Sequence, residues 1–105
     1  MNGGRRYIDV RCNYDLGGDP YRYPVEADED GRELRRIEHF EDGRIAYTDT
    51  GTSCGAVLAD LPIPPLEAIV ADPVFQAWYI LREAFEEQWA RAIEAGGPAL
   101  DRNTR

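Results

Sequence analysis

The segment 33–50 contains two strand-like runs separated by the tripeptide Glu41-Asp42-Gly43, and this arrangement constrains the fold more than any other feature of the chain. An Asp-Gly step between two such runs is a strong short-range signal for a β-hairpin. The segment therefore predicts two adjacent antiparallel strands, and the rest of the fold has to be built around them.

The length of the hairpin loop decides which side chains share a face of the sheet. A two-residue loop would place Ile37 on the opposite face from Ile45 and Tyr47. A three-residue loop with a glycine bulge would instead pair His39 with Ile45 and Ile37 with Tyr47. We favour the three-residue loop because it gathers the three apolar side chains on one face, and it places His39 on the core side.

The N-terminal part of the chain predicts one further strand and an acidic loop. Residues 7–14 alternate between two faces, as in a half-buried strand. Residues 21–25 fit a short extended piece, which Pro24 would confine to a sheet edge. Residues 26–31 are rich in carboxylates and end in Gly31, so we expect an exposed loop with solvated acidic side chains.

The C-terminal part of the chain predicts two helices around an ambiguous segment. Residues 65–71 suit a short helix that starts at a proline and stops before a second one. Residues 74–80 match both strand alternation and a helical stripe, and the pattern alone leaves the two open. Residues 81–95 predict an amphipathic helix. Its apolar stripe consists of Leu81, Phe85, Trp89, Ala92 and Ile93.

Together these segments predict a single α+β domain over residues 1–95, followed by a flexible tail over residues 96–105. A small antiparallel sheet of three to five strands is packed on one face by the C-terminal α-helix, and there is one short additional helix. We expect Phe85 and Trp89 to pack against the sheet. The sheet residues expected beneath these two rings are Ile8, Val10 and Ile37.

Several short motifs occur in an order that resembles a family of short bacterial proteins catalogued as a domain of unknown function. These motifs are Tyr7-Ile8-Asp9-Val10-Arg11, Phe40-Glu41-Asp42-Gly43-Arg44, Gly51-Thr52 with Gly55, Pro62-Ile63-Pro64-Pro65-Leu66-Glu67-Ala68-Ile69, Asp72-Pro73-Val74-Phe75, and Phe85 with Trp89. The chain departs from the family pattern at Cys12, where an aromatic residue is usual, and at His39, where an apolar residue is usual. The resemblance implies a strand at 74–80 and a helix from near Leu81, and it implies no activity.

The charge of the chain narrows the class of partner. Twelve basic residues against 20 acidic ones leave a formal charge of -8. This balance argues against nucleic acid, whose binding depends on neutralising phosphates, and it favours a basic protein partner. The chain has no apolar run long enough for a membrane and no secretory signal, so we expect a cytoplasmic protein that does not contact a membrane.

Three residues are candidates for catalysis, namely Cys54, His39 and Asp9. Cys54 lies in a glycine-flanked loop, where His39 could act as its base. Asp9 shares a strand face with polar neighbours. Packing or local hydrogen bonding is the more common role for each, because no spacing signature joins them. Two cysteines and one histidine without close ligand spacing also give no reason to expect a disulfide with Cys12, a metal site or a cofactor.

The expected function is therefore binding rather than catalysis, although the sequence leaves catalysis undecided. The residues expected to make contact are Tyr21, Arg22, Tyr23, Asp28, Glu29 and Asp30. We expect a non-catalytic acidic protein that neutralises or escorts a basic protein partner, in the manner of an immunity protein. The alternatives are a small accessory enzyme of a modification or biosynthetic pathway, with its site between the sheet and the 50–65 loop, and a homodimer formed through an exposed edge strand or the outer face of the sheet.

Overall fold

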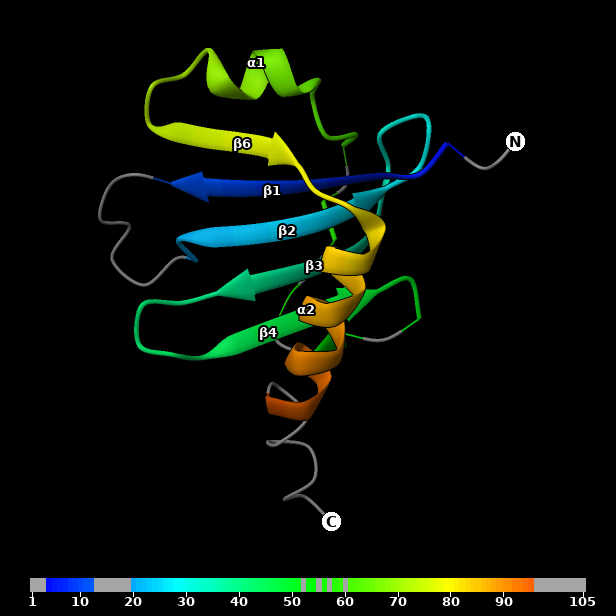
Figure 1. Ribbon diagram of the computed structural model, residues 1–105, viewed down its shortest axis with the longest axis vertical. Helices are drawn as coiled ribbons and strands as arrows, with labels where there is room; N and C mark the ends of the chain where they lie inside the picture. Colours follow the sequence, from blue (N-terminus) through cyan, green and yellow to red (C-terminus); the bar gives the residue numbers. More distant parts are fainter. Residues whose placement is uncertain are drawn as a thin grey trace.

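A computed structural model describes residues 4–12, 20–51, 53–54, 56, 58–59 and 61–95 of the chain. The strands are β1 (Arg6–Cys12), β2 (Arg22–Ala27), β3 (Glu33–His39), β4 (Ile45–Asp49), β5 (Ser53–Cys54) and β6 (Phe75–Tyr79), and the helices are α1 (Leu66–Val70) and α2 (Arg82–Ala95). The strands form one antiparallel sheet in the order β5-β4-β3-β2-β1-β6, and α2 crosses one face of it (Figure 1). The α+β fold is therefore confirmed, with β5 adding only two residues at one edge.

The hairpin formed by β3 and β4 has the three-residue loop that the glycine-bulge arrangement predicts. The N–H of Phe40 donates to the carbonyl of Arg44 over 3.0 Å, which leaves residues 41–43 as the loop. Gly43 has a φ of 95°, a conformation that other residues rarely adopt. The glycine of the Asp-Gly step is therefore required by the backbone of the turn.

The register of this hairpin confirms the predicted arrangement of its side chains. His39 pairs with Ile45, and Ile37 pairs with Tyr47. Ile37 and Tyr47 are buried in one cluster, and Ile45 packs against it. His39 lies on the same face at the end of the strand.

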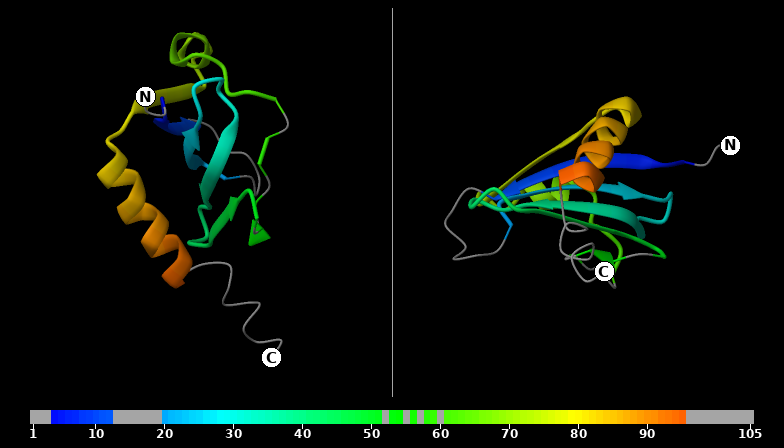
Figure 2. Two further views of the ribbon diagram at one scale, coloured as in Figure 1. Left: turned by 90° about the vertical axis from the view of Figure 1, so that its right-hand side faces the viewer. Right: turned by 90° about the horizontal axis from the view of Figure 1, so that it is seen from below.

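Strand β1 is buried on both of its faces, so the prediction of a half-buried strand is wrong. Tyr7 is 8% exposed, and Ile8, Asp9 and Val10 are each 1% exposed. Each face has its own cover: Tyr7 packs against Phe85 of α2, and Val10 on the opposite face lies beneath the segment that includes α1. Figure 2 shows α2 along one face of the sheet and the segment leading to α1 on the other side.

Strand β2 lies inside the sheet, so the prediction that Pro24 confines it to an edge is also wrong. β2 pairs with β1 on one side and with β3 on the other. Its pairs with β3 include Arg22 with His39 and Val25 with Arg36, but none at Pro24, whose nitrogen carries no hydrogen to donate. The strand therefore accommodates the proline because its pairing with β3 is interrupted at this position.

Helix α2 packs on the sheet face that carries Tyr7, Ile37 and Tyr47. Phe85 is fully buried, and its ring centroid lies 5.4 Å from that of Tyr7. Trp89 meets Tyr47 nearly edge-on, with the ring centroids 5.3 Å apart. These aromatic contacts form the core between the helix and the sheet.

Two details of the predicted helix packing are wrong. Ile8 and Val10 do not lie under α2, because they alternate with Tyr7 along β1 and point to the opposite face. Leu81 and Ile93 do not belong to the buried stripe, since they are 73% and 45% exposed. The helix crosses the sheet along a narrower line of contact than its apolar pattern indicates.

Arg35 of β3 joins the sheet to α2 by charge as well as by packing. Its guanidinium donates to Glu86 over 3.0 Å and 2.6 Å and to Glu26 over 2.6 Å. It also lies 4.9 Å from the ring centroid of Phe85 and 5.0 Å from that of Trp89. Burial acts to lower the pKa of Arg35, but the hydrogen bonds with the two carboxylates outweigh it and raise the pKa.

The segment before α2 is a strand, as the family resemblance implied. β6 runs antiparallel to β1 at the sheet edge, and α1 confirms the predicted short helix. Neither helix among the described residues is long and apolar enough to cross a membrane. The predicted tail over residues 96–105 lies outside the described residues.

Phe85→Ala is expected to lower the free energy of unfolding by about 3 to 5 kcal/mol, because it removes a fully buried ring. The control Leu81→Ala removes a side chain that is 73% exposed, and it should change the same quantity by less than about 0.5 kcal/mol. Urea denaturation followed by tryptophan fluorescence measures both. Equal effects from the two substitutions would show that α2 is not seated through Phe85.

Candidate functional site

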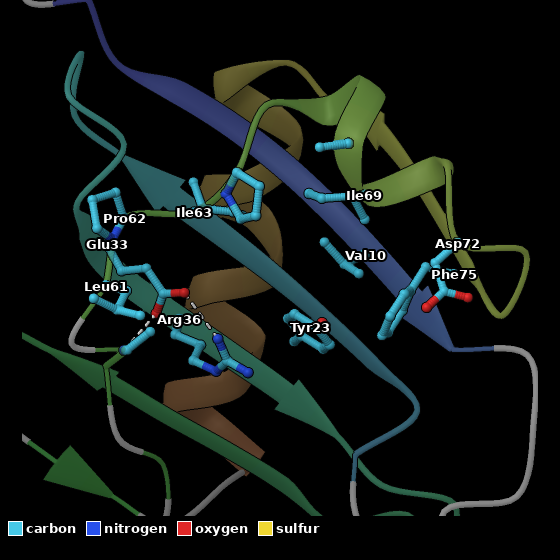
Figure 3. Close-up of a pocket in the computed structure, with 13 residues that line it drawn as sticks. Val10, Tyr23, Glu33, Arg36, Leu61, Pro62, Ile63, Ile69, Asp72 and Phe75 are labelled. Atoms are coloured by element: carbon cyan, nitrogen blue, oxygen red, sulfur yellow. Dashed lines mark hydrogen bonds and ion pairs between the residues drawn. The ribbon is translucent and has the colours of Figure 1, made fainter.

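A pocket of about 500 Å³ lies on the sheet face opposite α2. It is roofed by the segment that includes α1, which we call the arm (residues 59 and 61–72) (Figure 3). The lining residues are Val10, Tyr23, Glu33, Arg36 and Phe75 from the sheet side and Ala59, Leu61, Pro62, Ile63, Pro64, Ala68, Ile69 and Asp72 from the arm. Mostly apolar walls with a few convergent polar groups are typical of a ligand site.

Two hydrogen bonds hold the arm against the sheet. The N–H of Ile63 donates to the carbonyl of Gly31 over 2.8 Å, and the N–H of Ala59 donates to the carboxylate of Glu33 over 3.0 Å. A Cβ at Gly31 would lie only 3.1 Å from the carbonyl oxygen of Ile63 and 3.3 Å from Cβ of Pro62. Gly31, whose φ is 88°, is therefore needed both for its turn and for the close approach of the arm.

The guanidinium of Arg36 lies at one side of the pocket between two carboxylates. It donates to Glu33 over 3.0 Å and to Glu38 over 2.7 Å, and it lies 4.3 Å from the ring centroid of Tyr23. Burial raises the pKa of Tyr23, although the charge of Arg36 acts in the opposite direction. This group of side chains carries one more negative than positive charge.

A further carboxylate, that of Asp72, lies at the exposed end of the pocket beside Phe75 (Figure 3). One of its oxygens accepts the N–H of Val74 over 3.1 Å. Among the described residues, no cationic side chain forms an ion pair with Asp72. The pocket therefore combines an apolar floor with uncompensated negative charge at its rim.

A second cavity, of about 400 Å³, lies on the other sheet face, and we call it the helix-side hollow. Its lining residues are Arg22, His39, Ile45, Ala84, Glu87, Gln88 and Arg91. Beneath it the guanidinium of Arg22 forms an ion pair with the carboxylate of Asp9. Asp9 is 1% exposed. Nε of Arg22 lies 3.0 Å and 3.1 Å from the two oxygens of Asp9, and Nη2 lies 2.6 Å from one of them.

The imidazole of His39 is the unusual group in the helix-side hollow. Its Nε2 is buried and has no hydrogen-bond partner among the residues that the structure describes. Burial, followed by the charge of Arg22, lowers the pKa of His39 below its usual value of 6.5, although a hydrogen bond with Gln88 and the charge of Asp9 act in the opposite direction. The ring is therefore neutral at pH 7.

The structure brings together only some of the predicted site residues. Asp9, His39 and Arg22 meet near the helix-side hollow, but Asp9 is buried in an ion pair rather than in an open cleft. Cys54 belongs to β5, and its side chain lies outside the described part of the chain. A Cys54–His39 pair and a disulfide with Cys12, neither of which the sequence favours, therefore also lie outside the described residues. Within the described residues no group of three His, Cys, Asp or Glu side chains could hold a metal ion.

The predicted tyrosine and arginine contact surface is divided between the two faces of the sheet. Arg22 points to the α2 face, where it binds Asp9, whereas Tyr23 points into the pocket under the arm. Tyr21 lies before β2, and its ring centroid is 6.5 Å from that of His39. Neighbours in an extended strand alternate in direction, so these side chains cannot form one patch.

The predicted acidic loop is shorter than expected. Glu26 is in β2 and is 4% exposed, so the prediction that it is solvated is wrong. The carboxylate of Asp28 accepts the N–H groups of Asp30 and Arg32 and closes its own turn. Only Glu29 and Asp30 of this segment present exposed acidic side chains.

The burial of Glu26 has a specific physical cause. Its carboxylate accepts the hydroxyl of Tyr7 over 2.9 Å and binds Arg35 and Arg5 over 2.6 Å and 3.2 Å. Burial acts to raise the pKa of Glu26, but these hydrogen bonds and charges lower it overall. A charged residue in a strand can thus be satisfied inside the fold, which its sequence context does not reveal.

No sequence pattern points to the charged residues that line the pocket, namely Glu33, Arg36 and Asp72. A register shift at Glu26/Ala27 pairs Glu33 with Ala27 and turns its side chain to the pocket face. Such a bulge has no signature in this stretch of sequence. The only available signal was the arm itself, whose three prolines at 62, 64 and 65 exclude a central strand and leave it to cross over the sheet.

Comparison with known proteins identifies one family. A family model described as "Domain of unknown function (DUF6881)" matches residues 6–94. No curated protein and no solved structure matches the chain. The matched range contains all the lining residues of both cavities.

Glu33→Ala should lower the free energy of unfolding by about 3 kcal/mol, because it takes one carboxylate from buried Arg36 and the acceptor from the N–H of Ala59. Glu33→Gln keeps an acceptor oxygen and should cost less. Hydrogen exchange at the backbone N–H of Ala59 should be faster in Glu33→Ala than in the unsubstituted protein. In Glu33→Gln the exchange rate of this N–H should stay close to that of the unsubstituted protein. The same exchange rate in all three proteins would mean that Glu33 does not hold the arm.

His39 should make stability depend on pH near neutrality. Its unfolded pKa is about 6.5 and its folded pKa is lower, so the unfolded chain binds the proton first as the pH falls. The contribution of neutral His39 to the free energy of unfolding is complete above the pKa of the unfolded state. It is lost as the pH falls through the pKa of the folded state. Urea midpoints measured from about pH 7.5 to about pH 5 should decline, and His39→Gln should flatten this decline. An unchanged slope in the variant would assign it to another group.

Proposed function

The chain belongs to the family described as a domain of unknown function, DUF6881, and from this premise we propose that it is a non-catalytic binding protein for a basic protein partner. The pocket under the arm receives a lysine or arginine side chain of that partner. The observation that carries this proposal is the combination of apolar walls with carboxylates that outnumber the guanidinium of Arg36.

The shape and lining of the pocket suit a long side chain with an apolar stem. Val10, Phe75, Ile63 and Ile69 offer apolar surface to the methylene groups, and a volume of about 500 Å³ exceeds what one such side chain needs. Lysine and arginine combine this kind of stem with a charged head. The stem would therefore be buried while the head reaches the polar end of the pocket.

The charges at the pocket favour a cation over an anion. Arg36 is already held by Glu33 and Glu38, so its charge is more than neutralised. Asp72 at the rim has no cationic partner among the described residues. An incoming ammonium or guanidinium group would find a carboxylate at the rim and aromatic faces beside it.

The exposed acids Glu29 and Asp30 add long-range attraction for such a partner. They belong to the turn that ends at Gly31, which touches the arm at Ile63 and so adjoins the pocket. With a net charge of -8, the chain should attract basic proteins at a rate that falls as salt is added. The pocket then supplies the short-range recognition that charge alone does not.

Catalysis is the less favoured function for this pocket, although it lies between the sheet and the segment 50–65, where an enzyme site was the alternative expectation. Its described lining contains no cysteine, histidine, serine or threonine side chain. Its buried carboxylate, Glu33, already accepts two hydrogen bonds. A general base needs an oxygen that is available to substrate.

The proposal is tested with N-acetyl-argininamide as the probe and N-acetyl-citrullinamide, its uncharged isostere, as the matched ligand. Amide shifts in NMR spectra should move at Val10, Tyr23 and Phe75 for the arginine probe and much less for the citrulline probe. Asp72→Asn should weaken the arginine probe about five-fold, whereas Glu67→Gln, on the exposed side of α1, should not. Equal binding of the two probes, or shifts away from the pocket, would contradict the proposal.

A second experiment tests the partner itself. Tagged protein should capture a basic protein from lysate at low salt, and the capture should be lost with Ala68→Phe, which fills the pocket. Ala71→Phe places the same ring on the arm outside the lining and should leave capture intact. If both variants capture alike, the pocket is not the contact. Light scattering over a range of concentrations shows whether the partner is a second copy of the chain.

A further inference from the structure

The helix-side hollow lies on the sheet face away from the arm, so its chemistry is separate from that of the pocket. Its walls come from the ends of β2 and β3 and from α2. The apolar residues Ile45 and Ala84 form part of the lining, and the remaining lining side chains are polar. The volume of about 400 Å³ is sufficient for a small polar group with an attached substituent.

Two guanidinium groups face this hollow, and each has N–H donors that remain available to a ligand. Arg22 uses Nε and Nη2 on Asp9, and its Nη1 has no hydrogen bond to any described residue. Arg91 makes one contact of 3.2 Å with Glu87 and is otherwise exposed. Both groups can therefore donate hydrogen bonds to a ligand oxygen.

The strand register concentrates positive charge at this place. Arg11, Arg22 and His39 stand opposite one another in a row across β1, β2 and β3. Like charges opposite one another are unfavourable unless a counter-charge is present, and Asp9 is the one carboxylate that the described residues provide between the two arginines. Nε of Arg11 is buried and has no hydrogen-bond partner in the described part of the chain, and the same holds for Nε2 of His39. Within the described ranges, no second carboxylate forms an ion pair with this row.

We propose that the helix-side hollow is a binding site for a phosphate group, held by Arg22, His39 and Arg91. Free phosphate keeps at least one proton at neutral pH. A phosphate monoester carries about 1.5 to 2 negative charges there, and because its second pKa is near 6 it can bind as the protonated monoanion. Its oxygens can accept from the two guanidinium groups while its proton is shared with Nε2 of His39. A carboxylate or a sulfate could accept the same hydrogen bonds but has no proton to share at this pH.

Titratable groups from β1, β2 and α2 surround the imidazole of His39 and influence its ionisation. These groups are Asp9 from β1, Arg22 from β2, Tyr21 next to β2, and Glu87 and Arg91 from α2, and the neutral side chain of Gln88 also lines the hollow. Phosphate bound beside Nε2 adds negative charge to this group and favours the protonated ring. Binding of phosphate and uptake of a proton by His39 are therefore coupled.

The chain contains a single histidine, so NMR of its imidazole reports on this site alone. Inorganic phosphate, sulfate and acetate are titrated at constant ionic strength. Phosphate should produce a saturable shift at His39 and raise its pKa. Sulfate should bind more weakly at pH 7 and approach phosphate only at lower pH, where the ring is protonated, and acetate should have little effect. Methyl phosphate distinguishes a monoester ligand from free phosphate. Its affinity should equal that of free phosphate only if the site accepts monoesters.

Matched variants of α2 test the assignment. Arg91→Gln should weaken phosphate binding about five-fold, and Arg82→Gln, which removes the same charge from an exposed position on the same helix outside the hollow, should not. His39→Gln should abolish the preference for phosphate over sulfate, as read from backbone shifts at Gln88. Absence of a saturable shift, or equal effects of phosphate, sulfate and acetate at pH 7, would overturn the proposal.

Discussion

The contact on which the rest of the structure depends is that of Arg35 with Glu26, Glu86 and the rings of Phe85 and Trp89. One guanidinium joins two carboxylates from different elements, Glu26 of β2 and Glu86 of α2, with distances of 2.6 Å to 3.0 Å. It also covers the aromatic core beneath the helix. Because bidentate arginine pairs are directional, this contact sets the rotation of α2 as well as its position. With α2 in place on one face, the other face is left for the arm, and the pocket and the helix-side hollow fall on opposite sides of the sheet.

Charge inside the sheet is a general property of this fold. Three groups, Asp9–Arg22, Glu26–Arg35–Glu86 and Glu33–Arg36–Glu38, place ion pairs on both faces. Every basic residue of the chain is arginine, which is less strongly hydrated than lysine and binds carboxylates in a planar fork. Buried ion pairs add little to stability compared with apolar replacements, so these groups are better understood as elements that select one register and hold polar atoms at the two cavities.

The elements that could be predicted from the sequence are those whose signals are local. The Asp-Gly step specified the loop and hence the pairing of Ile37 with Tyr47, and the stripe containing Phe85 and Trp89 specified the long helix. The burial of β1 could not be predicted, because alternation along a strand does not show whether its second face is covered. The burial of Glu26 could not be predicted either, because the partners of its carboxylate, Tyr7 and Arg35, are distant along the chain.

The sequence by itself determined the fold class, the hairpin register, the two helices and the net negative charge. These depend on periodicity, turn chemistry and composition, which are properties of neighbouring residues. Only the tertiary structure decided the strand order, the cover of both faces of β1, the anchoring of the arm at Gly31 and the meeting of Arg22 with His39. Those features arise from contacts between residues far apart in the chain, and a one-residue bulge between β2 and β3 is enough to turn Glu33 from one face to the other.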